Sequence, residues 1–268
     1  MPELPEVETI RRDLEKELIG LKIKDVKINV PKVIKDPTPQ TFRKEIVGKE
    51  FQHILRRGKN LILTLSASKQ LLIHLKMTGQ LIYGDEQPQS RVCFILSNGR
   101  YLNFNDVRLF GSIRLVSDWE KAKGIADLGP EPLEADFTFE TFKKILSGKK
   151  TKIKPLLMDQ SFIAGIGNIY AQEALFRAGI HPERPASSLR DKEIKDLFSQ
   201  IRGVLNEAIK YRGSSIDDYV DAQGKKGGFE ERLQVYGWEG RSCCRCNTAI
   251  KKIELGGRGT CFCPGCQK

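Results

Sequence analysis

The stretch CCRCNTAIKKIELGGRGTCFCPGC, residues 243–266, determines the fold at the C-terminal end of this chain. Cys243 and Cys246 form one CxxC pair, and Cys263 and Cys266 form another. Two such pairs at this separation supply four thiolates to one tetrahedral metal ion, which is the arrangement of a zinc ribbon. The pattern therefore predicts a hairpin held together by one structural Zn²⁺.

Two other interpretations of these cysteines remain open, namely a pair of disulfides and an iron site of the iron-sulfur or rubredoxin type. Cys93 stands apart from the other cysteines of the chain, which is unlike a dispersed disulfide framework. Cys244 and Cys261 are spare, so the register of the ligands is open as well. Because four cysteine ligands leave no coordination position for catalysis, we expect the metal to shape the hairpin. The hairpin tip presents Arg258 between glycines that let a phosphate approach the backbone.

The charge balance of the chain favours a polyanionic partner. Its 268 residues include 45 Lys and Arg against 34 Asp and Glu, a formal net charge of +11. Nucleic acid is the first expectation and an anionic membrane surface the second. No run approaches 18 consecutive apolar residues, and the first residues are acidic where a signal peptide would be basic and then apolar. We therefore expect a folded cytoplasmic protein without membrane association.

The first half of the chain has the pattern of one helix followed by a β-domain. Residues 5–20 place apolar side chains at spacings of three and four, with proline near the start and glycine at the end, as in an amphipathic helix. From residue 22 to 118 short alternating or apolar runs predict a β-sandwich or barrel, with SNGR at 97–100 as a hairpin turn.

The second half has a helical period, and the two halves predict an α+β multidomain protein. The stretch DLGPEPLEADF, residues 127–137, has neither the helical nor the strand period of apolar residues, so we expect a domain boundary near residue 130. A stretch rich in Gly, Asp and Ser from 213 to 237 is typical of a long mobile loop. We expect a catalytic domain over 2–130, a helical DNA-binding domain over 131–222, and the loop end with the zinc module over 223–268.

Six blocks, taken together and in this order, resemble formamidopyrimidine-DNA glycosylase, a bacterial family of base-excision repair enzymes. The blocks cover essentially the whole chain and read MPELPEVET (1–9), RRGKNLIL (56–63), HLKMTG (74–79), FNDVRLFG (104–111), DQSFIAGIGNIYA (159–171) and GGRGTCFCPGCQ (256–267). The resemblance implies an N-terminal helix with a β-sandwich domain, and a C-terminal helix-two-turns-helix domain carrying a zinc-ribbon hairpin. It also implies a monomer that binds double-stranded DNA containing oxidised bases or abasic sites, in association with the nucleoid.

The resemblance implies a catalytic role for the N-terminus. A chain that begins Met-Pro normally loses its methionine, which would leave Pro2 with a free secondary amine. Such an amine has a pKa of about 7.7 to 8.0, so roughly a tenth is neutral at pH 7, and its adduct with a sugar C1′ is a cationic iminium that permits β-elimination. By resemblance Pro2 is the nucleophile, Glu3 the acid, Lys59 an aid to β-elimination and Arg258 an aid to the second elimination.

A glycosylase must also turn its target nucleotide out of the duplex. By resemblance Met77, Arg108 and Phe110 fill the gap, although Met77 and Phe110 taken alone are typical of core residues. The candidates for phosphate contact are Lys59, His74, Lys154, Asn168 and Arg258, and Glu6 and Arg91 are further residues of the DNA-binding set, Glu6 in a supporting role. The lysine run at Lys149 and Lys150 is added to them, although such a run is usually a solvated face.

The chain departs from the family pattern at a few positions. Where the family usually reads DPRRFG, this chain has Val107 and Leu109 and so lacks a proline and one arginine. Arg91 stands where the family commonly places a histidine, and Cys261 where it places another residue. The preference for the base opposite the lesion is therefore open.

Three functions are compatible with these residues. The leading one is a bifunctional glycosylase and lyase that removes oxidised purines, such as 8-oxoguanine and formamidopyrimidines, and cuts the strand by β,δ-elimination. The second is an endonuclease VIII-like enzyme acting on oxidised pyrimidines, and the third is a zinc-ribbon protein that binds damaged DNA without cutting it. The pairing of Pro2 with Glu3 favours an enzyme, since a binding protein has no need of both.

Overall fold

The computed structural model describes all 268 residues, and they form two compact units. The first comprises Met1–Asp127 with Ile209–Glu230, and the second comprises Leu128–Ala208 with Glu231–Lys268. Residues 209–222, which the sequence assigns to the helical domain, and residues 223–230 therefore pack with the first unit. The division into three functional parts at 130 and 222 stays a prediction.

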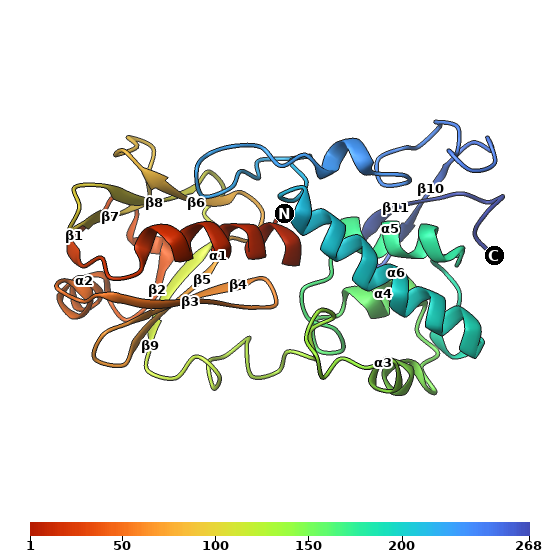
Figure 1. Cartoon of the computed structure of the whole chain (residues 1–268), viewed down its shortest axis with the longest axis horizontal. Helices are drawn as coiled ribbons and strands as arrows, with labels where there is room; N and C mark the ends of the chain where they lie inside the picture. The colour runs from red at the N-terminus through yellow and green to blue at the C-terminus, as the bar shows by residue number, and fades with distance from the viewer. The chain divides into compact units, whose positions relative to one another are not determined.

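Two β-sheets and two helices make up most of the first unit (Figure 1). The helices are α1 (Leu4–Leu18) and α2 (Pro39–Ile46), with a short 3₁₀ turn η1 (Pro31–Val33). The strands are β1 (Ile23–Ile28), β2 (Ile34–Asp36), β3 (Phe51–Arg57), β4 (Asn60–Leu65), β5 (Lys69–His74), β6 (Gly79–Gly84), β7 (Val92–Leu96), β8 (Tyr101–Asp106) and β9 (Ser112–Val116). One sheet has the order β1-β7-β8-β6 and the other β2-β9-β5-β4-β3.

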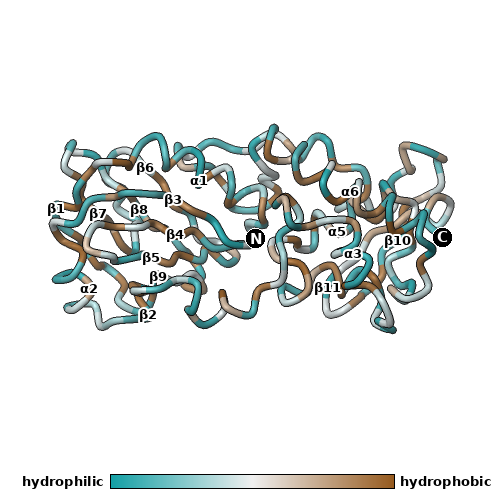
Figure 2. Tube along the Cα trace, turned by 60° about the horizontal axis from the view of Figure 1, so that its bottom comes forward, coloured by the Kyte–Doolittle hydropathy of each residue, from teal (hydrophilic) through white to brown (hydrophobic).

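The two sheets enclose one hydrophobic core, which confirms the predicted sandwich and excludes a single closed barrel. Ile10 and Leu14 of α1 are fully buried in this core with Phe94 of β7 and Ile73 of β5. Strands of the unit carry apolar residues and the turns between them are more polar (Figure 2), and central strands such as β4 bury several consecutive side chains. The SNGR turn joins β7 and β8, which pair antiparallel as predicted.

The second unit is helical apart from its C-terminal hairpin, as the sequence predicts. Its elements are α3 (Phe139–Leu146), α4 (Ile153–Met158), α5 (Asn168–Ala178), the turn η2 (Ala186–Ser188), α6 (Asp191–Lys210), whose last two residues belong to the first unit, β10 (Lys251–Leu255) and β11 (Arg258–Phe262). α5 ends at Gly179, whose φ of 70° is a left-handed conformation that glycine adopts without strain. Phe176 of α5 packs against the cysteine module, so helix and hairpin share a core.

The segment after α6 is irregular apart from the 3₁₀ turn η3 (Phe229–Arg232), in agreement with the predicted loop. The sequence did not indicate that parts of it are buried. Tyr219 belongs to the core of the first unit, and Asp221 is 1% exposed. None of the helices combines the length and the apolar content that spanning a bilayer would need.

We expect Phe94→Ala to lower the free energy of unfolding of the first unit by about 3–5 kcal/mol, because it empties a fully buried site that lies edge-on to Phe42. Urea unfolding would measure this. The matched control is Ile19→Ala at a 45% exposed position, for which we expect a change within about 0.5 kcal/mol. Equal effects of the two substitutions would contradict the described core.

Candidate active site and DNA interface

The strand register of the first unit gathers several predicted site residues at one end of the sandwich. Asn60 pairs with His74, and His74 pairs with Ser112, so the β3–β4 turn that carries Lys59 lies beside the end of β5. Gly79 pairs with Asp106 in the other sheet. The connections 75–78 and 107–111 therefore both cross between the sheets at this end. They carry Met77, Arg108 and Phe110.

Helix α1 is anchored to the same end through Glu8. The Glu8 carboxylate accepts hydrogen bonds from Arg11, Arg12 and, at 3.0 Å, from Nε of Arg56 in β3. Burial by itself raises the pKa of Glu8, but these guanidinium groups outweigh it and lower the pKa below its ordinary value. Because Arg56 also donates to the carbonyl of Gly58, the first turns of α1 are tied to the turn that carries Lys59.

Pro2, Glu3 and Glu6 are all buried at the start of α1, with Glu3 2% and Glu6 1% exposed. The carboxylate of Glu6 accepts the backbone N–H of Glu3 at 2.8 Å and that of Ser214 at 2.9 Å. These contacts hold the backbone beside Pro2 and connect it with the segment after α6. Glu6 is enclosed by protein groups, so its geometry suits support of the N-terminus.

Burial lowers the pKa of His74 to about 3, and the positive charges of Lys76, Lys59 and Arg114 act in the same direction. The imidazole is therefore neutral near pH 7. Its Nδ1 accepts the backbone N–H of Lys76 at 3.0 Å, which leaves the proton on Nε2. His74 thus offers one neutral N–H donor.

Met77, Arg108 and Phe110 form an exposed cluster, here called the wedge. Met77 is 40% and Phe110 53% exposed, so the core interpretation that fits such residues taken alone is wrong for both. The guanidinium carbon of Arg108 lies 4.7 Å from the centre of the Phe110 ring, and its Nη1 lies 3.3 Å from the Met77 sulfur. The structure brings these three predicted residues together on two neighbouring connections.

The carboxylate of Asp106 shapes the loop that carries the wedge, and sequence reasoning assigned it no role. It accepts the backbone N–H of Gly111 at 2.6 Å, that of Arg108 at 3.2 Å and the hydroxyl of Thr78. A Cβ at Gly111 would lie 2.9 Å from Asp106 Oδ2, so only glycine fits there. Arg91 donates from Nε to the Asp106 carbonyl at 3.0 Å and so supports the same loop.

In the second unit, Lys154 and Asn168 meet behind the hairpin tip. Lys154 is fully buried, and its Nζ lies 2.7 Å from Asn168 Oδ1 and 2.8 Å from Thr260 Oγ1. Asn168 is the first residue of α5, directly after the glycine-rich turn. Arg258 at the start of β11 is exposed, and the hairpin places it two residues before Thr260.

The predicted lysines near the start of α4 lie apart from this network. Lys149 Nζ lies 4.5 Å from the centre of the Phe162 ring, and Lys150 is exposed. Nothing in these contacts distinguishes Lys150 from a solvated surface residue.

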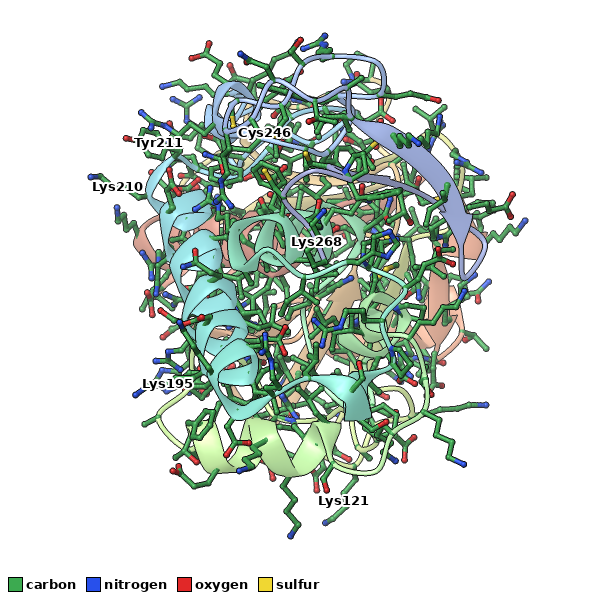
Figure 3. The ribbon with its side chains drawn as sticks, turned by 90° about the vertical axis from the view of Figure 1, so that its right-hand side faces the viewer. Lys121, Lys195, Lys210, Tyr211, Cys246 and Lys268 are labelled. Carbon is green, nitrogen blue, oxygen red and sulfur yellow. The ribbon has the colours of Figure 1, made fainter.

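The four predicted cysteine ligands come together as one cluster. The sulfur atoms of Cys243, Cys246, Cys263 and Cys266 all lie within 4.8 Å of one another. Cys246 lies at the surface of the module (Figure 3), and Cys263 is buried. The cluster therefore consists of the two CxxC pairs and does not include Cys244 or Cys261.

We expect the depressed pKa of His74 to make the protein less stable in mild acid. Unfolding frees the imidazole to bind a proton below its ordinary pKa of about 6.5, so this stability is complete above pH 6.5 and is lost as the pH falls toward 3. Between pH 7 and pH 5 the loss would reach up to about 2 kcal/mol in urea unfolding. His74→Gln, which cannot titrate, should show a smaller loss. Identical pH profiles would contradict an imidazole that stays neutral in the folded protein.

Comparisons with known proteins agree with this arrangement. Residues 1–113 match the formamidopyrimidine-DNA glycosylase N-terminal domain, and residues 128–220 match the H2TH domain of the same family. A formamidopyrimidine-DNA glycosylase of Pelotomaculum thermopropionicum is 49% identical over 100% of this chain and 99% of that protein.

Solved structures of the Lactococcus lactis protein Fpg are similar over the whole length. A mutant in complex with DNA containing Fapy-dG has a TM-score of 0.92 and 38% identity, with 100% of both chains covered. The wild-type protein in complex with DNA containing an oxidised pyrimidine has a TM-score of 0.91 at the same identity and coverage. With identity of this extent over the full length, the chain belongs to the formamidopyrimidine-DNA glycosylase family.

Proposed function

We propose that this protein is a bifunctional DNA glycosylase and abasic-site lyase that excises oxidised purines from double-stranded DNA. The observation that carries the proposal is the wedge, in which Met77, Arg108 and Phe110 contact one another and are exposed together. It lies at the sandwich end that also carries Lys59 and to which the start of α1 is tied. Such a protein would act as a monomer at the nucleoid in the cytoplasm.

The chemistry begins at the nitrogen of Pro2. While Met1 is attached this nitrogen is an amide, so removal of Met1 is required to expose its lone pair. The amine then attacks C1′ of the damaged nucleotide as the bond from C1′ to the base breaks, and Glu3 supplies a proton to the departing group or to the opening sugar. Loss of the sugar ring oxygen from C1′ leaves an iminium ion.

The iminium ion permits strand cleavage, because it accepts the electron pair released when a proton leaves C2′. Expulsion of the 3′ phosphate completes β-elimination, and expulsion of the 5′ phosphate completes δ-elimination. We assign assistance in the first elimination to Lys59 and in the second to Arg258. Both are cations able to stabilise a departing phosphate.

The wedge would enter the duplex in place of the extruded nucleotide. Met77 and Phe110 would replace the lost stacking, and Arg108 would hydrogen-bond the orphaned base. Phosphates beside the gap would be held by Arg258 and by N–H donors of His74 and Asn168. Lys154 and Glu6 are buried, so we assign to Lys154 the positioning of Asn168 and to Glu6 the positioning of the N-terminus.

The cysteine cluster fits one zinc ion. A tetrahedral site with Zn–S bonds of about 2.3 Å separates the sulfur atoms by about 3.8 Å. The Cys243 and Cys266 sulfurs lie 3.8 Å apart, and those of Cys246 and Cys263 lie 3.4 Å apart. All four ligands are thiolates, so zinc would brace the β10–β11 hairpin and take no part in the reaction.

An oxidised-pyrimidine glycosylase is the second candidate, since an Fpg relative has been crystallised with DNA containing such a base. Excision rates on 8-oxoguanine and on oxidised pyrimidines, each opposite all four bases, would distinguish the two enzymes. A binding protein without catalysis is the third candidate, and it would yield no excised base.

We expect borohydride to trap a covalent complex between the methionine-free protein and a duplex containing 8-oxoguanine, because reduction converts the iminium into a stable amine. Peptide mass spectrometry should locate the adduct at Pro2. A variant that retains Met1 serves as the control and should form no adduct. Full activity of protein that keeps Met1 would contradict the proposed mechanism.

We expect one zinc per chain, and removal of zinc should weaken binding to an abasic-site duplex by about tenfold or more, because the hairpin that presents Arg258 loses its brace. Elemental analysis and a binding titration would measure the two quantities, and melting of the hairpin should appear as a lower Tm. Unchanged affinity in protein proven to be metal-free would contradict this role.

A further inference from the structure

We propose that Gln172 is a positioning residue that holds Asn168 and the Arg258 hairpin at a fixed separation, so that both reach phosphates of the same strand. This inference rests on the proposed function. Gln172 lies on α5, one turn after Asn168, and is 2% exposed. Nothing in its position in the sequence indicates a role.

The side-chain amide of Gln172 joins α5 to strand β11 with both of its ends. Its Oε1 accepts the backbone N–H of Cys261 at 2.7 Å. Its Nε2 donates to the carbonyl of Gly259 at 3.2 Å and to the carbonyl of Asn168 at 2.9 Å. A backbone N–H only donates and a carbonyl only accepts, so these partners permit one orientation of the amide.

That orientation determines the orientation of Asn168. Gln172 Nε2 also lies 3.0 Å from Asn168 Oδ1, so its two hydrogens are shared among three acceptors, and Oδ1 receives a hydrogen bond from Lys154 Nζ as well. Lys154 Nζ and Gln172 Nε2 are both donors, so the Asn168 side-chain atom that they contact must be the oxygen Oδ1. The nitrogen Nδ2 of Asn168 therefore points away from these two groups. One N–H of Nδ2 points to the Gly259 carbonyl at 3.3 Å, and the other is available to a phosphate oxygen.

The side-chain amide of Gln172 also holds strand β11, which begins at Arg258. Gly259 and Cys261 lie on either side of Thr260, which Lys154 contacts, so three consecutive residues of β11 are attached to α4 and α5. Lys154 binds β11 through one hydrogen bond from its ammonium group to Thr260. Gln172 binds it through two, one to the Gly259 carbonyl and one from the Cys261 N–H. Removal of Gln172 would release the Gly259 carbonyl and the Cys261 N–H while leaving Lys154 in place.

The test uses Gln172→Met, which keeps the length of the side chain and removes its hydrogen bonds, in the zinc-loaded full-length protein. We expect both Gln172→Met and Asn168→Ala to weaken binding to an abasic-site duplex about tenfold, which is the size of one hydrogen bond to a charged group. The double variant should be weaker than either single variant but well short of a hundredfold, because Gln172 acts partly through Asn168 and partly through the Arg258 hairpin. For Gln172→Met alone, the rate of base excision at saturating DNA should change less than threefold.

A second double-mutant cycle, which combines Gln172→Met with a substitution of His74, gives the matched control. His74→Ala removes a phosphate donor of the other unit, so its combination with Gln172→Met should multiply to about a hundredfold. If Gln172→Met does not fold, as judged by zinc content and Tm, Gln172→Glu replaces it, since the carboxylate still accepts the Cys261 N–H but cannot donate to Asn168.

The outcomes separate the inference from the function on which it rests. Wild-type affinity for Gln172→Met, or about a hundredfold loss for the Asn168 double variant, would overturn the inference. Failure of the wild-type protein to bind or cut lesion-bearing DNA would instead overturn the proposed function.

Discussion

Buried carboxylates that accept backbone N–H groups hold the functional loops of this protein in place. Glu6 accepts the N–H groups of Glu3 and Ser214, and Asp106 accepts those of the wedge loop. In the second unit, Glu173 of α5 accepts three consecutive N–H groups from Gln234 to Tyr236. Burial raises the pKa of Glu173 despite these donors. An unpaired carboxylate is costly in such places, so each loop has one conformation that satisfies its acid.

This constraint explains how an apolar wedge can stay exposed. Met77 and Phe110 gain nothing from water, and their connections could in principle collapse onto the sandwich. Asp106 opposes collapse because its bonds to Arg108 and Gly111 would be lost. The stacking of the Arg108 guanidinium on the Phe110 ring covers part of the apolar surface. The wedge is therefore held in one exposed conformation by the protein itself. A group fixed in this way loses less conformational entropy when it binds a partner.

The sequence predicted those features that depend on local pattern. The cysteine pairs, the strand alternation and the helical period are local, and each appears in the structure. The helix α2 was missed although Thr38, which caps it by accepting the N–H of Thr41, was a visible signal. The bonds of Gln172 could not be predicted, because Cys261 is 89 residues away in sequence and only the fold brings the two together. The exposure of the wedge is equally non-local, and the family resemblance alone indicated it.

Two of the departures from the family pattern, Val107 and Leu109, lie in the wedge loop, and the groups that hold this loop can be considered separately from them. Leu109 has a φ of 56°, a left-handed conformation that is strained for a branched side chain, and Val107 is 79% exposed. The groups bound to the Asp106 carboxylate belong to Thr78, Arg108 and Gly111, and none of them is a departure. Arg91, which is a departure, supports the same loop through the Asp106 carbonyl. Leu109 packs partly against the core of the first unit, where an arginine would have to extend toward solvent. The loop therefore keeps its shape and carries one cation, Arg108, between Asp106 and Gly111.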